Sequence, residues 1–157
     1  MRALIAAVAA VGLAAAAHTQ SSDSHVVRVT VLQRNSIVVV GGDITLIVNP
    51  LSPPTVNQTC DVMWFCNGQG NRKITVRSSL VNPRYSLTVE ARNITGNGQN
   101  PGIAAGVVPL RDGVDRDFIT RIRSSLGAAD LRYSASATWA AGLGTDVHTV
   151  TYTLADR

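Results

Sequence analysis

Strict alternation of apolar and polar side chains is the clearest pattern in the chain, and it is strongest near the C-terminus. Residues 131–139 alternate with a period of two, and residues 148–154 repeat that period after a glycine-rich turn at residues 141–146. Such alternation is typical of strands that are buried on one face and solvated on the other. Two strands joined by a short turn predict a hairpin over residues 130–155. Its expected inward side chains are Leu131, Tyr133, Ala135, Ala137, Trp139, His148, Val150, Tyr152 and Leu154.

The same period and several β-branched runs predict further short strands between turn residues. The candidate strands are residues 25–32, 36–40 with 44–48 as one interrupted strand, 59–66, 72–78, 85–90, 106–110 and 117–122. Residues 93–102 are predicted to be a loop rich in glycine and asparagine, and residues 118–126 also fit a short helix. The fold class that these patterns predict is all-β, an antiparallel immunoglobulin-like β-sandwich of about seven to nine strands.

The N-terminus has the composition of a secretory signal peptide. Arg2 supplies a positive charge, residues 3–16 form an apolar run, and Ala15 and Ala17 are small residues at a cleavage site. The expected organisation is a signal peptide at 1–17, a flexible leader at 18–24 and a single β-sandwich domain at 25–157. The expected location is secreted, periplasmic or at the cell surface. The apolar run is shorter than the roughly 20 residues of a stable membrane span.

Composition and charge exclude several classes of function. The formal net charge is +4, but the basic residues are scattered, and no cluster of lysine and arginine with interleaved aromatic residues predicts a nucleic-acid surface. The sequence contains no Gly-x-Ser-x-Gly, no His-Glu-x-x-His and no phosphate-binding glycine loop. We therefore expect a protein that is not an enzyme and that needs no cofactor.

The only two cysteines are Cys60 and Cys66. Disulfides form in oxidising compartments, so the predicted export favours a bond between them. In a straight strand, however, their Cα atoms are about 20 Å apart at 3.3 Å per residue, and a disulfide needs about 7 Å or less. The segment is therefore either folded back into a loop, or the two thiols are free or paired between molecules.

A loop closed by that disulfide would present Trp64 and Phe65 to solvent, which makes them the candidate ligand-binding residues. The competing interpretation places Val62 and Trp64 in the core. Asp112, Asp115 and Asp117 are weak candidates for calcium, because their spacing does not match a calcium loop and arginines lie between them. A solvated turn with local ion pairs is the better interpretation, so no metal site is predicted.

Several turn and strand motifs are spread over most of the chain after residue 17: Asn67-Gly68-Gln69-Gly70-Asn71-Arg72-Lys73-Ile74-Thr75, Ala104-Ala105-Gly106-Val107-Val108, Tyr133-Ser134-Ala135-Ser136-Ala137-Thr138-Trp139-Ala140-Ala141-Gly142 and Thr149-Val150-Thr151-Tyr152-Thr153-Leu154. In these motifs the chain resembles a group of small secreted bacterial β-sandwich proteins of unknown function. The layout is more distantly similar to β-sandwich subunits of bacterial surface fibres. The resemblance implies a structural domain and transfers no catalytic residue.

Two functions follow as hypotheses. The first is a non-enzymatic structural or assembly domain that associates with itself, or with a cell-surface or extracellular component, through exposed strand edges. Residues 24–32 are the candidate for a donated strand, because they follow a polar leader. The second is an extracellular module that binds a ligand such as a carbohydrate through Trp64 and Phe65.

Overall fold

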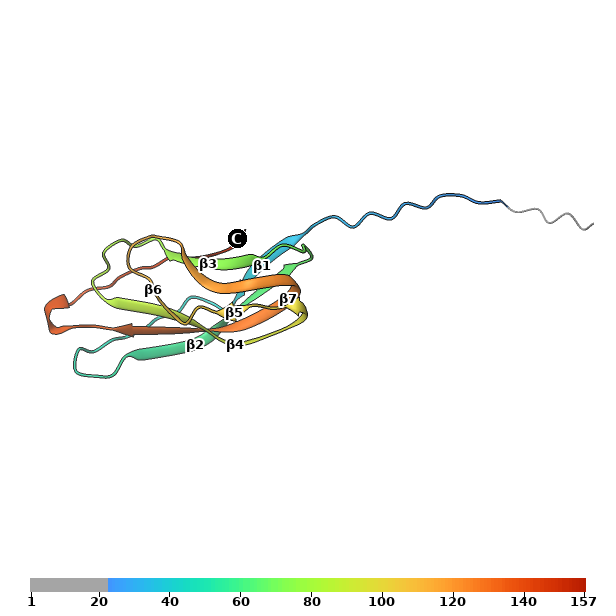
Figure 1. Ribbon diagram of the computed structural model, residues 1–157. Coiled ribbons are helices and arrows are strands. Elements are labelled where there is room, and N and C mark those ends of the chain that lie inside the picture. The colour runs from blue at the N-terminus through green and yellow to red at the C-terminus, as the bar shows by residue number, and fades with distance from the viewer. Residues whose placement is uncertain (1–22) are drawn as a thin grey trace, which may run out of the picture. The chain divides into compact units, whose positions relative to one another are not determined.

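The computed structural model describes residues 23–157, and regular structure in that part of the chain is almost entirely β (Figure 1). Residues 32–157 form one compact unit, whereas residues 23–31 have no regular secondary structure. The elements in chain order are β1 (Asn35–Val40), β2 (Thr55–Cys66), β3 (Arg72–Ser78), β4 (Ser86–Asn100), β5 (Ile103–Ala104), β6 (Val107–Pro109), β7 (Arg116–Ser136), the short 3-10 helix η1 (Trp139–Ala141) and β8 (Val150–Asp156).

The strand β7 is the centre of the sheet. It is 21 residues long, and its first part pairs with β3 and β5, whereas its second part pairs with β2 and β4. Arg121 and Ser124 have positive φ angles where the partners change. Irregularities of this kind bend and twist a strand locally, so a single strand continues from one side of the molecule to the other.

The predicted β-sandwich is wrong: the eight strands of the described chain form one antiparallel sheet that curls into a nearly closed barrel. The order along the sheet is β1-β2-β7-β3-β8, and its two end strands, β1 and β8, come into contact without pairing. Because β7 belongs to both sides, the sheet is not divided into two separate layers. Alternation of side chains indicates that each strand has one buried face, but it does not distinguish a sandwich from a curled sheet.

The predicted C-terminal hairpin is also wrong. The strand β8 pairs along its whole length with β3, in a register that runs from Arg72 opposite Asp156 to Ser78 opposite Val150. The inward phase was predicted correctly for Tyr133 and Tyr152, which are buried. The inward orientation predicted for Trp139 is wrong, because β7 ends at Ser136 and Trp139 is 74 % exposed.

Three further segments differ from the predictions. Residues 25–32 form no strand, and neither do residues 44–48, although Ile44 and Leu46 pack partly against the core. Residues 93–100 are strand rather than loop, since β4 pairs with β7 as far as Asn100 after a bulge near Asn93. The strand predicted at residues 117–122 is confirmed as part of β7, whereas the alternative of a short helix at residues 118–126 is wrong. Long pairing with β7 therefore overrides the weak local preferences of the glycine-rich segment.

The core lies between the two sides of the curled sheet, and Trp64 is one of its largest fully buried residues. Its indole packs directly on Gly127 of β7, where a side chain would overlap the ring. On the other side, the rings of Phe118 and Tyr152 are 5.2 Å apart. Apart from Tyr133, the remaining large side chains of the core are aliphatic, which agrees with the 4 % aromatic content of the sequence.

Candidate functional site: free strand edges and an apolar segment

Two features stand out on the described chain: an apolar segment that is exposed, and strand edges that have no partner. Residues 25–32 carry Val27, Val29 and Val31 on one alternating phase, and all three side chains are largely exposed. This segment has no strand partner among residues 23–157. A segment with apolar side chains at alternate positions, and with no partner strand for its backbone N–H and C=O groups, is suited to pair with the edge of a sheet.

Asn67, in the turn between β2 and β3, fixes the point at which this segment joins the folded unit. Its side-chain oxygen accepts a hydrogen bond from the Arg34 amide at 2.6 Å, and its Nδ2 donates to the Leu32 carbonyl at 2.8 Å. Its own amide donates to the Arg34 carbonyl at 3.3 Å. The sequence indicated only a turn at Asn67, because the Asn-Gly signal does not reveal this contact with residues 32–34.

Besides the short strands β5 and β6, two longer strands of the described sheet have a partner on one side only. The strand β1 pairs only with β2, and β8 pairs only with β3. Val39 of β1 lies opposite the fully buried Val62, and is therefore on the core phase, yet it is 45 % exposed. The core is thus incompletely covered along the free edge of β1, where the curled sheet fails to close against β8.

The cysteines lie at positions that exclude the predicted intrachain disulfide. Both are in β2, which is a straight strand paired with β1 and β7, and both are buried free thiols. The Cys60 thiol contacts the Gly42 carbonyl at 3.4 Å. Six residues of extended strand separate the two sulfur atoms too far for a bond, so the geometric objection outweighs the argument from compartment.

Trp64 and Phe65 are adjacent on β2 and therefore point to opposite faces. Trp64 is 1 % exposed and belongs to the core, whereas Phe65 is 39 % exposed on the outer face. Phe65 lies opposite Leu126 of β7, and the two line a shallow hollow of about 280 Å³ together with Asn97. No stapled loop presents both aromatic rings to a ligand.

Outer-face apolar side chains around Phe65 form a cluster that the sequence did not reveal, because it depends on register. Val38 of β1 lies opposite Met63 of β2. Met63 is two residues before Phe65 on the same face of β2, and Phe65 lies opposite Leu126. We call these four residues the outer patch, and each of them is at least 39 % exposed.

Two of the three candidate aspartates form ion pairs with nearby basic side chains. Asp112 pairs with Arg116, and the hydrogen bond from that guanidinium lowers the pKa of the carboxyl group. Asp117 pairs with Lys73 at 2.6 Å, and Asp115 joins neither pair. Within residues 23–157, no group of three or more His, Cys, Asp or Glu side chains is placed to hold a metal ion.

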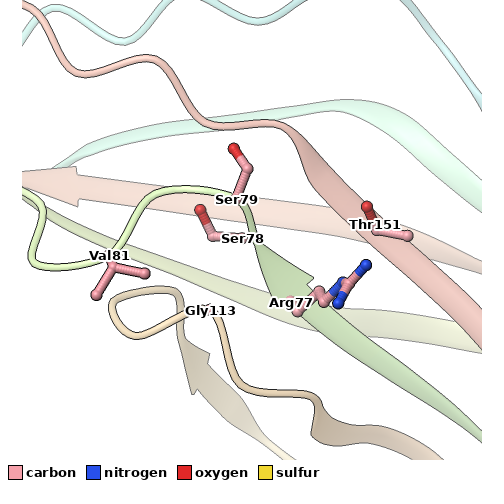
Figure 2. Close-up of a pocket in the computed structure, with 6 residues that line it drawn as sticks. All are labelled: Arg77, Ser78, Ser79, Val81, Gly113 and Thr151. Atoms are coloured by element: carbon pink, nitrogen blue, oxygen red, sulfur yellow. The ribbon is translucent and has the colours of Figure 1, made fainter.

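A second hollow, of about 320 Å³, lies at the ends of β3 and β8 (Figure 2). Ser78 borders it and its hydroxyl is 2.8 Å from Nδ1 of His148, a pairing typical of an activated nucleophile. However, Ser78 is 2 % exposed, and its oxygen also accepts a hydrogen bond from the Leu80 amide. Burial lowers the pKa of His148, against the effect of the Asp146 carboxylate. The pair therefore connects two chain segments and offers no nucleophile to a substrate.

Comparison with protein-family models, curated proteins and solved structures found no match. No helix in residues 23–157 is long and apolar enough to cross a membrane. The predicted signal peptide at 1–17 and most of the predicted leader at 18–24 lie outside the described residues.

Proposed function

We propose that this protein is a secreted or cell-surface structural domain that assembles by donating residues 25–32 to the sheet of a second copy. The observation that carries the proposal is the exposed apolar phase Val27, Val29 and Val31 in a segment without a strand partner. The signal-peptide composition of residues 1–17 supports export.

The acceptor is the free edge of β1, where the sheet stays open toward β8. Natural edge strands are usually protected by charged side chains, proline or bulges. The strand β1 has none of these over Asn35–Val40, and β8 has neither proline nor a charged residue before Asp156. A strand added beside β1 would place an apolar side chain next to the half-exposed Val39 and cover the core there.

Contacts at Asn67 favour donation to another molecule over folding back onto the same β1. Folding back would require a hairpin turn at Gln33 and Arg34, immediately before Asn35. Two-residue hairpin turns need positive φ angles and therefore favour glycine or asparagine, which are absent at both positions. The Leu32 carbonyl and the Arg34 amide, which the turn would have to reorient, are already hydrogen-bonded to the Asn67 side chain.

The direct test replaces Val27, Val29 and Val31 with aspartate in the chain recovered after export. This arm variant should remain a folded monomer, while the native protein forms oligomers in light scattering and negative-stain microscopy. The matched control, Arg28→Asp with Thr30→Asp, adds negative charge to the other phase of the segment and should still assemble. A native protein that stays monomeric at high concentration refutes the proposal.

The acceptor edge is tested with Val39→Asp, against Val107→Asp on the exposed edge strand β6 as the control. Val39→Asp should abolish oligomers and Val107→Asp should retain them. The Val39→Asp variant retains an intact segment 25–32, and the arm variant retains an intact β1 edge. A mixture of the two should therefore yield a one-to-one dimer. Assembly that persists in Val39→Asp but fails in Val107→Asp would place the acceptor at β6 instead.

A carbohydrate site at Phe65 is the second candidate, favoured by the hollow between Phe65, Leu126 and Asn97. An exposed aromatic ring beside an amide suits the apolar face and the hydroxyls of a sugar. The test is a glycan array with the native protein and a Phe65→Ala variant. Signals that Phe65→Ala removes would support the site, and an array without signals would exclude it.

A further inference from the structure

Two loops at one end of the barrel carry large apolar side chains that contact almost nothing. Leu51, in the loop before β2, is 73 % exposed, and Leu143, in the loop between β7 and β8, is 98 % exposed. Trp139 and Val147 on the second loop are similarly exposed. We call these four residues the apolar tip.

The register places both loops at the same end of the sheet. The first residue of β2, Thr55, lies opposite Ala135, one residue before the end of β7. Figure 1 shows the loop before β2 and the red-orange loop after β7 at this end, away from the turn that joins β2 to β3. The exposed residues therefore lie on two loops at the same end of the barrel.

Several backbone groups of the tip already have hydrogen-bond partners within the protein. Tyr85 donates its hydroxyl toward the carbonyls of Gly142 and Gly144, at 3.1 Å each, and the Arg84 guanidinium donates to the Leu143 carbonyl. The Leu51 amide donates to the Asn49 side chain at 2.9 Å. Backbone groups that are already hydrogen-bonded cost much less to remove from water than unpaired ones.

The charges around the tip suit a lipid surface. Residues 49–54 and 137–145 contain no charged side chain, and the nearest acid, Asp146, accepts a hydrogen bond from the Tyr85 amide. The Arg84 side chain contributes a positive charge at the base of the tip, and the whole chain has a formal net charge of +4. Tryptophan is enriched at the boundary between lipid headgroups and acyl chains, and cationic residues favour anionic headgroups.

We infer that the apolar tip inserts Trp139, Leu143 and Leu51 into the interface of a lipid bilayer, with Arg84 at the level of the headgroups. Two uncharged loops whose apolar side chains are exposed, and in which several backbone groups are already hydrogen-bonded, fit a deformable lipid surface. The inference concerns a different surface from the strand edges, and it holds for a single copy of the chain.

Tryptophan fluorescence measures the insertion directly, because the chain has only two tryptophans and Trp64 is already buried. The exported chain carrying the arm substitutions, which removes any effect of assembly, is mixed with vesicles of phosphatidylcholine and phosphatidylglycerol. The emission of Trp139 should shift to shorter wavelength, and the protein should sediment with the vesicles. A Trp139→Phe variant should lose the shift, which would show that the shift comes from Trp139.

The decisive variant is Leu143→Asp, which retains both tryptophans. It should weaken vesicle binding about tenfold or more, since the loss of one buried leucine side chain already accounts for that factor. The matched control is Leu126→Asp, which puts the same charge on the half-exposed outer patch and should bind like the parent.

Three results would overturn the inference. They are an unshifted spectrum with no sedimentation, equal loss in the Leu143→Asp and Leu126→Asp variants, and binding that Leu143→Asp leaves intact. Circular dichroism of each variant checks that a loss of binding does not reflect unfolding.

Discussion

The hydrogen bond between the hydroxyls of Tyr133 and Tyr152 gives the sharpest prediction about stability. It joins β7 to β8 across the interior of the barrel, with the two oxygens 2.8 Å apart. Both residues are at least nine-tenths buried, and each hydroxyl has the other as its only hydrogen-bond partner in the described chain. Replacing either tyrosine by phenylalanine therefore leaves the other hydroxyl buried and unpaired.

The free energy of unfolding should fall by about 1–3 kcal/mol in Tyr133→Phe and by a similar amount in Tyr152→Phe. The double variant removes both polar groups together, so it should lose at least about 1 kcal/mol less than the sum of the two single losses. Urea denaturation of the four proteins, followed by circular dichroism, measures this coupling. Additive losses would show that the two hydroxyls do not depend on each other.

The same pair predicts how stability changes at alkaline pH. Burial raises the pKa of Tyr152, and that of Tyr133, above the ordinary value of 10.0. Above pH 10.0 the unfolded chain releases these protons while the native protein keeps them, so the free energy of unfolding decreases as the pH rises. The double phenylalanine variant should lose this dependence, and an unchanged slope would contradict the assignment.

Three other predictions follow from single contacts. Gly127→Ala places a Cβ within 2.7 Å of Nε1 of Trp64 and should destabilise the protein by about 1–3 kcal/mol in urea, whereas Gly70→Ala, with no atom within 4 Å, should be nearly neutral. Because burial lowers the pKa of His148 below 6.5, protonation favours the unfolded state, so stability should decrease as the pH falls below 6.5. A His148→Gln variant should show a shallower decrease, and a slope equal to that of the native protein would refute this. A thiol reagent should label no cysteine in the native protein and two after unfolding, whereas a disulfide would leave none to label in either state.

The sequence was sufficient to predict several strands from their alternation, although the alternating residues 25–32 form none in the described chain. The predicted strand at residues 72–78 is β3, and its expected inward residues Ile74 and Val76 are fully buried. Which strands pair could not be predicted, since the period of two indicates only that a strand has two different faces. Tyr133 and Tyr152 were placed correctly inward, yet they face each other across the core rather than along a hairpin.

The site was predicted less well because it depends on register and on contacts distant in sequence. Residues 25–32 were singled out from their alternation, but they form no strand in the described chain. The exposure of Val39 and the hydrogen bonds from Asn67 to the chain before β1 have no local sequence signal. Trp64 carried no sign that distinguished a core residue from a presented one, since that depends on whether β2 is straight.

The measurement that tests the central claim most directly is the oligomeric mass of the chain without residues 1–17, determined by light scattering at high concentration beside the arm variant. The account predicts oligomers of the native protein, unchanged by reductant because the buried thiols form no link, and monomers of the variant. A native protein that is monomeric under every condition would contradict assembly through the segment 25–32. Oligomers that persist in the arm variant would contradict it equally.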